Sequence, residues 1–197
     1  ETQKQMGKEG NKPVDEAGLY ESVGYAFDAG SEAIKYDNMP NAKGKINPKF
    51  GTIVDQLYAL RAQLINGGIF YQNAKDNAKA YKYLARYVET ADCPMFAKFD
   101  KSKDQNLTEI AYFATYYAYQ NKDYAKAEKY VEYALKNPER AKEAQQLKLA
   151  VLGAQLKTRQ DSLAYAAKLE TIYAEDPSND AILTTLTSTY SSLGMQD

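Results

Sequence analysis

The chain has 197 residues, a net charge of −1, no histidine and one cysteine, Cys93. The missing histidine excludes Ser–His–Asp and Cys–His nucleophile systems and histidine-based zinc sites, and a single cysteine excludes an intrachain disulfide. Because there is no basic field, nucleic acid is a poor partner, and no apolar run approaches the roughly 20 residues of a membrane span.

Helical periodicity runs through the whole chain. Apolar residues recur at the spacing of a helix, and no stretch shows the sustained alternation of a strand. Together with the positions of proline, this pattern predicts eight helices, over residues 14–36, 48–73, 76–90, 107–120, 123–136, 141–157, 160–174 and 179–193. Most connections are short, so consecutive helices are expected to pack antiparallel; only 37–47 and 91–106 are long and irregular.

Two adjacent glycines, Gly67 and Gly68, fall inside the helix predicted over 48–73. Each costs about 0.5–1 kcal/mol relative to alanine in a helix. Such residues are kept where another backbone comes close, and Ala80 is a matching small residue on the next helix. The glycines therefore predict a close helix crossing, which a leucine at position 68 is expected to overpack by about 1–3 kcal/mol.

The long connection over 91–106 carries oxygen-bearing side chains at alternate positions near its end. As in the first part of an EF-hand loop, these are Asp100, Ser102, Asp104, Asn106 and Thr108. The glycine and the bidentate glutamate of that loop are replaced by Gln105 and Ala111, and two lysines are interleaved. The sequence therefore favours a solvated loop ending in a helix cap at Asn106, with Glu109 as its reciprocal partner, and predicts no metal site.

The segment NKDYAKAEKYVEYALKNP, over residues 121–138, has the pattern of a helix-turn-helix repeat. A turn is followed by a small residue, by aromatic residues at helical spacing and by proline. The segment resembles the tetratricopeptide repeat family, whose unit of about 34 residues places small residues where its two helices cross and large residues between them. The positions that define the repeat fall on Gly68, Tyr71, Ala80, Leu84, Ala127, Ala134, Pro138, Gly153 and Pro177.

The resemblance covers about residues 61–194 and implies a single domain over 1–197. This domain would be an all-α, right-handed α–α superhelix of antiparallel helix pairs. Residues 14–60 would form irregular N-terminal helices and a loop. Three repeat units would follow, over 61–90, 107–138 and 146–177, and then the first helix of an incomplete fourth unit, over 179–194. Tyr165, where alanine is expected, and Ala118, where an aromatic residue is expected, depart from the family pattern. The partial units at both ends lead us to expect a segment of a longer array.

The family resemblance also implies a binding groove, because its members commonly bind ligands with first-helix residues on the concave side. The matching residues here are Ile65, Ile69, Gln72, Tyr112, Tyr116, Tyr119, Ala150, Lys157, Thr184 and Ser188. The Lys, Asn and Arg set with which some members clamp a carboxylate is missing, which leaves an apolar, tyrosine-lined channel. Exposed aromatic surface of this kind is usually a contact site. Alternatively, the N-terminal helix or the 91–106 loop covers these tyrosines.

The leading functional hypothesis is a non-enzymatic scaffold that binds a protein or peptide in this groove, without cofactor or metal. The alternative is a helical module for a small ligand such as an oligosaccharide, which would stack on the tyrosines beside Glu109, Gln72 or Lys157. An enzyme ranks third, because it would need a carboxylate pair that only folding could bring together. No membrane insertion by this segment is expected, and the unpaired terminal helix is a further site of self-association. Similarity to bacterial members of the family, some of them exported, is the only ground for expecting an exported or envelope location.

Overall fold

The computed structural model describes residues 15–195, which form eight α-helices, two 3-10 helices and no strand. The all-α prediction is therefore confirmed for the described part of the chain. Val14, where the first helix is predicted to begin, lies outside it. The chain divides into two compact units, Glu1–Ile110 and Ala111–Asp197, and each is described by itself. The single repeat domain over 1–197 stays a prediction.

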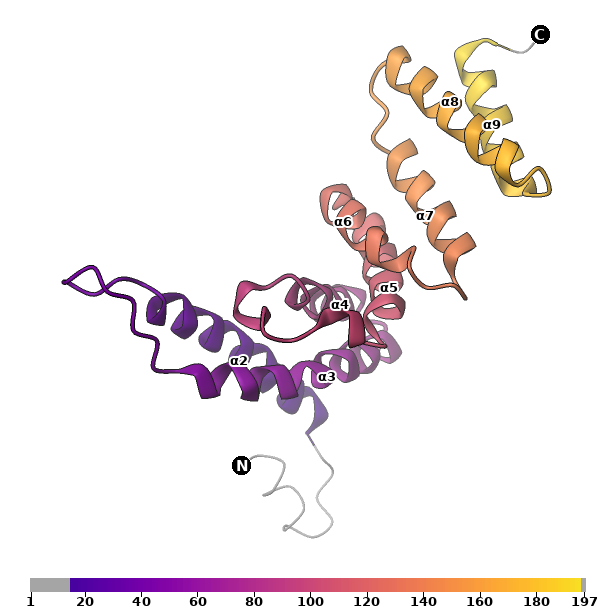
Figure 1. The fold of residues 1–197 in the computed structure, drawn as a ribbon. Helices are drawn as coiled ribbons and strands as arrows, with labels where there is room; N and C mark the ends of the chain where they lie inside the picture. The colour runs from indigo at the N-terminus through magenta and orange to yellow at the C-terminus, as the bar shows by residue number, and fades with distance from the viewer. Residues whose placement is uncertain (1–14, 196–197) are drawn as a thin grey trace. The chain divides into compact units, whose positions relative to one another are not determined.

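The first unit is built around a long central helix, α3, which packs against both α2 and α4. Figure 1 shows α2 and α3 side by side, joined by a loop that projects from the end of the pair. After α4 the chain makes two 3-10 turns before it enters α5. The elements are α2 (Glu16–Asp37), α3 (Gly51–Asn73), α4 (Asn77–Thr90), η1 (Pro94–Phe96), η2 (Lys101–Lys103) and the start of α5 (Leu107–Gln120).

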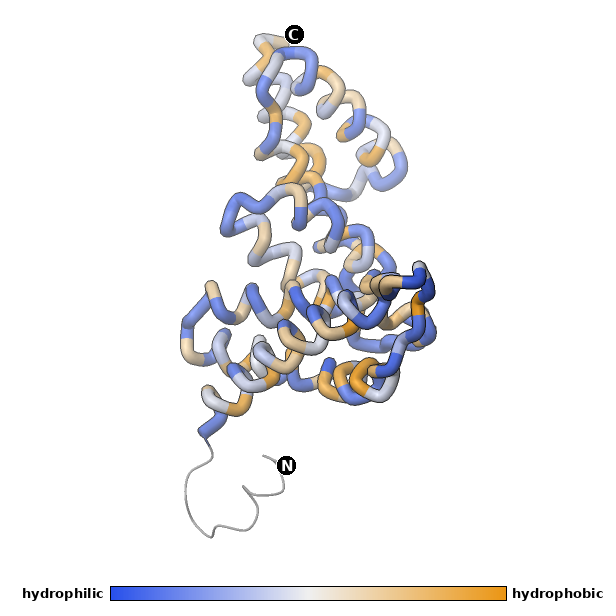
Figure 2. Tube along the Cα trace, turned by 90° about the vertical axis from the view of Figure 1, so that its left-hand side faces the viewer, coloured by the Kyte–Doolittle hydropathy of each residue, from blue (hydrophilic) through white to orange (hydrophobic). Residues whose placement is uncertain are grey.

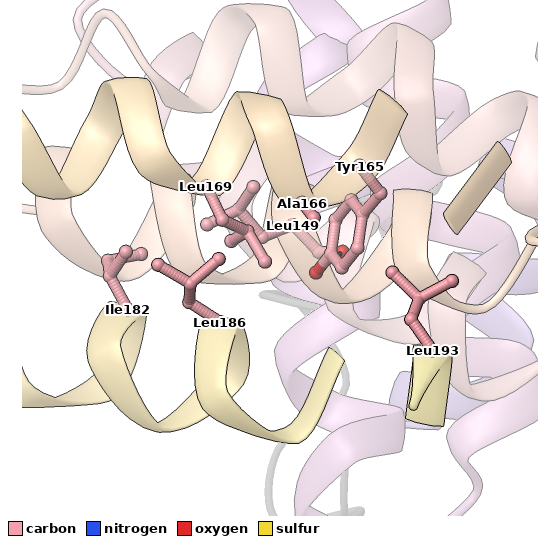
Figure 3. Close-up of a cluster of buried hydrophobic side chains, with 7 residues drawn as sticks. All are labelled: Leu149, Tyr165, Ala166, Leu169, Ile182, Leu186 and Leu193. Atoms are coloured by element: carbon pink, nitrogen blue, oxygen red, sulfur yellow. Dashed lines mark hydrogen bonds between the residues drawn. The ribbon is translucent and has the colours of Figure 1, made fainter. Parts of the chain in front are cut away.

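The second unit contains the rest of α5 and four further helices. Within it, α6 packs against α7 and α8 against α9, whereas α7 and α8 touch much less. Figure 3 shows side chains from α8 and α9 pointing toward one another in one apolar cluster, which Leu149 of α7 joins. The elements are α6 (Tyr124–Ala134), α7 (Ala141–Gly153), α8 (Arg159–Glu175) and α9 (Asp180–Leu193).

The turns α3–α4 and α5–α6 have the same construction. Lys75 and Lys122 adopt positive φ angles of 61° and 59°. The aspartates that follow, Asp76 and Asp123, each cap the next helix by accepting the N–H of the residue three positions on. The same Lys–Asp pair thus forms both turns. The lysine adopts the left-handed backbone conformation after one helix, and the aspartate carboxylate caps the start of the next.

Several predicted helix boundaries differ from the observed ones, most of them by a single residue. Helix α3 begins at Gly51 instead of 48, α6 ends at Ala134 instead of 136, and α7 ends at Gly153 instead of 157. The last difference has a clear cause, because the N–H groups of Lys157 and Thr158 donate to the Asp161 carboxylate at 3.1 and 2.9 Å. These bonds belong to the capping box that starts α8, so Lys157 lies in the turn and not on the face of α7.

The glycine at position 68 lies where α3 crosses α4. A Cβ atom built there would lie 2.3 Å from Cδ2 of Leu84, a side chain that is itself fully packed. The close approach is thus made by a side chain of α4, whereas the sequence predicted an approaching backbone. Gly51, at the start of the same helix, has nothing within 4 Å of the corresponding position.

Replacing Gly68 by alanine is therefore expected to destabilise the chain by about 1–3 kcal/mol, although alanine is the better helix former. The matched change Gly51→Ala should instead stabilise it by about 0.4–1 kcal/mol, because it only restricts the unfolded chain. Urea unfolding of both variants measures the difference. Equal stabilisation by the two changes would show that the crossing at Gly68 is not tight.

Hydrophobic and hydrophilic residues are interleaved along the helices, as the colours of Figure 2 show. None of the helices in the described residues combines the length and the apolarity that a membrane crossing requires. The apolar residues instead form helix faces that pack against neighbouring helices within each unit.

Candidate functional site

The residues predicted to line a groove fall into the two units. In the first unit, Ile69 and Gln72 of α3 are exposed and Ile65 is half-buried. In the second, Thr184 and Ser188 are exposed on α9, and Lys157 lies outside any helix. The single groove that would join the two sets stays a prediction, so the candidate site is taken within the second unit alone.

A row of three tyrosines follows one face of α5, since Tyr112, Tyr116 and Tyr119 are spaced four and three residues apart. Tyr116 is 44% exposed, and the other two are partly buried. The ring of Tyr119 packs against that of Tyr124, with 6.1 Å between centroids.

An arginine that the sequence did not single out completes this row. The guanidinium carbon of Arg140 lies 5.1 Å from the ring centroid of Tyr112 and 5.4 Å from that of Phe113. Arg140 is the N-cap residue of α7, so the start of that helix brings a positive charge beside the tyrosine row. Its separation in sequence from α5 left no local signal for this pairing. The second unit therefore presents a surface of tyrosine rings next to a cation.

Conversely, the first unit holds a buried polar network that fixes the 91–106 connection. The Arg61 guanidinium donates to a carboxylate oxygen of Asp104 at 2.8 Å and to the Thr90 hydroxyl at 2.6 Å. The side chains of Arg61 and Asp104 are only 8% and 6% exposed. The hydroxyl of Tyr87 donates to the other oxygen of Asp104 at 2.6 Å. Burial, followed by the Asp104 carboxylate, raises the pKa of Tyr87 above its usual value.

This network explains why Asp104 is not placed as a calcium ligand. Both of its oxygens accept hydrogen bonds from side chains of α3 and α4, and its Oδ1 also accepts the N–H of Asn106 at 3.2 Å. Helix α5 begins directly after Asn106, where the cap is predicted. Asp100 bonds to Ser102 instead, so the alternating oxygens point to different partners. Among the described residues no group of three or more acidic or cysteine side chains could hold a metal ion.

The spacing of apolar residues in α3 indicates that Arg61 is buried. Arg61 lies four residues after Leu57 and three before Leu64, both of which are buried, so it occupies the apolar stripe of α3. A charged residue in such a stripe is rarely fully buried without a partner. The partner itself could not be identified from spacing, because Asp104 is far along the chain.

Comparison with family models, with curated proteins and with solved structures finds no match for this chain.

Proposed function

We propose that the chain is a tetratricopeptide-type array of helix hairpins that serves as a non-enzymatic scaffold for a protein or peptide partner. Two features support the repeat. The turns at Lys75–Asp76 and Lys122–Asp123 are built alike, and the small residues at the expected helix crossings, Ala80, Ala127 and Ala134, are completely buried. Repeats of this kind bury one face of each helix pair and leave another face free for partners.

The single observation that carries the binding proposal is the tyrosine row of α5. A half-exposed ring at Tyr116, flanked by Tyr112 and Tyr119 and by the Arg140 guanidinium, offers rigid apolar area beside hydroxyl groups and a positive charge. Tyrosine and arginine are the residue types that contribute most to protein interfaces, because they bury large area at little entropic cost. A peptide with aromatic or aliphatic side chains suits this surface best.

A selection from a random peptide display library, made with the wild type and with Tyr116→Ala, tests the proposal. We expect the wild type to enrich peptides whose binding weakens at least about tenfold in Tyr116→Ala, because loss of a hot-spot residue typically costs more than 1 kcal/mol. The matched control is Tyr25→Ala, which removes an exposed tyrosine of α2.

The proposal fails if no peptide is enriched, or if Tyr116→Ala and Tyr25→Ala weaken binding equally. Binding of oligosaccharides on a glycan array, lost in Tyr116→Ala, would favour the small-ligand alternative. Lys157, one of the polar residues that this alternative would use, lies in the turn before α8, where its N–H donates to Asp161.

A further inference from the structure

A second exposed surface lies in the first unit, on the loop between α2 and α3, which projects at the left of Figure 1. Large apolar side chains are unusually exposed there. Of the nine such side chains that are most exposed in the described part of the chain, four belong to this segment. They are Tyr36 (60%), Met39 (45%), Ile46 (59%) and Phe50 (48%). Together with Lys43, Lys45 and Lys49 of the loop, they form what we call the 36–50 surface.

The loop is held in shape by its own hydrogen bonds, not by burial of these side chains. At its base the Asp37 carboxylate accepts the N–H groups of Lys49 and Phe50 at 2.8–2.9 Å. At its tip the Asn41 side chain accepts the N–H groups of Lys43 and Lys45, and Gly44 takes the left-handed conformation that the turn needs, with a φ of 72°. Such preorganisation lowers the entropic cost of binding a partner.

Positive charge accompanies the apolar side chains. The loop carries Lys43, Lys45 and Lys49, and no acidic side chain of the described residues forms an ion pair with any of them. Asp37, the acidic residue within the segment 36–50, accepts hydrogen bonds from backbone N–H groups. The 36–50 surface is therefore locally basic on a chain whose net charge is −1. Its complement is a partner that carries negative charge.

The distribution of the apolar side chains decides between a peptide and a membrane. Three of them, Tyr36, Met39 and Phe50, line a hollow of about 450 Å³ together with Lys45 and Lys49. Ile46 does not line it, and the rest of the lining is Ala33, Asp37, Asn41 and Asn47. The tip of the loop, over 41–45, is polar. A segment that enters a lipid interface needs its apolar side chains to lie deepest, and a polar tip opposes this. A hollow lined by both apolar side chains and lysines instead fits a protruding apolar side chain of an acidic peptide.

We propose that the 36–50 surface is a docking site for an acidic peptide segment in which Asp or Glu flanks a bulky apolar residue. The apolar side chain enters the hollow, and the flanking carboxylates meet Lys45 and Lys49. This site is separate from the tyrosine row of α5, so it does not depend on the function proposed above.

Fluorescence anisotropy with a labelled peptide tests this site, using glutamates on both sides of a Leu–Phe pair. Two sister peptides, one with lysine for glutamate and one with serine for Leu–Phe, separate the charge from the apolar contribution. We expect the acidic apolar peptide to bind about tenfold or more tightly than either sister, and added salt to weaken it. The paired changes Met39→Ser with Phe50→Ser, and Lys45→Glu with Lys49→Glu, should each reduce its affinity about tenfold.

Matched controls keep the result specific. Leu183→Ser and Lys168→Glu alter exposed residues of the same types elsewhere and should bind as the wild type does, as should Tyr116→Ala. Circular dichroism checks that every variant is folded. The proposal is overturned if the three peptides bind equally or not at all, or if the loop variants bind as the controls do. It is also overturned if these variants abolish binding to anionic phospholipid vesicles, or self-association in sedimentation, while leaving peptide binding unchanged.

Discussion

Replacing Asp104 by alanine is expected to destabilise the chain by about 3–5 kcal/mol, because the change leaves the Arg61 guanidinium buried without its anionic partner. The loss has further components in this structure. The Tyr87 hydroxyl also loses its acceptor, and the 91–106 connection loses its Asp104 bonds to α3 and α4. Urea unfolding followed by circular dichroism measures the change in the free energy of unfolding.

The chain contains a matched control for this experiment. Lys98 and Asp55 also form an ion pair between the 91–106 connection and α3, but their side chains are 51% and 59% exposed. Exposed pairs contribute little, because water and salt screen them. Asp55→Ala should therefore have a much smaller effect than Asp104→Ala. Equal effects of the two changes would mean that burial of the Arg61 pair carries no energetic weight.

A double-mutant cycle separates the cost of the unpaired charge from the value of the pair. In Arg61→Met, an apolar side chain of similar length replaces the cation in the stripe of α3. If the unpaired guanidinium causes most of the loss, then Asp104→Ala should destabilise the Arg61→Met background far less than it destabilises the wild type. Additive effects would instead assign the loss to the bonds that Asp104 makes with Tyr87 and Asn106.

The helices could be predicted from the sequence because their signals are local. Apolar spacing and the capping aspartates act within a few residues, and the predicted and observed bounds agree at 107–120 and differ little elsewhere. The end of α7 was misplaced because the residues after Gly153 remain apolar at helical spacing. The competing signal, Thr158 with Asp161, belongs to the next helix and takes over the N–H of Lys157.

The features that depend on distant pairs could not be predicted in the same way. Arg140 meets Tyr112, and Asp104 meets Arg61, only after the chain has folded. The 36–50 surface is a similar case, since the sequence identified an irregular loop but not how it is held. Its shape depends on Asp37 reaching the backbone of Lys49 and Phe50, a bond that spans the whole connection.

Tyr165 lies at the contact between α7 and α8. Tyr165 occupies the position where the family pattern expects alanine, and its ring lies between α7 and α8, with its hydroxyl donating to the Leu149 carbonyl at 3.0 Å. A Cβ atom at Gly153 would lie 3.2 Å from that hydroxyl oxygen, so the glycine leaves room for the larger ring. Helix α8 packs more extensively against α9 than against α7.

Leu169→Ala is therefore expected to destabilise the chain by about 2–5 kcal/mol, because Leu169 is fully buried at the centre of the cluster that joins α8 to α9 (Figure 3). The matched control is Leu183→Ala, which removes the same atoms from a side chain of α9 that is 41% exposed, and should change the free energy of unfolding far less. Thermal and urea unfolding of both variants measure the difference. If the two leucines prove equally dispensable, then the pairing of α8 with α9 does not stabilise the second unit.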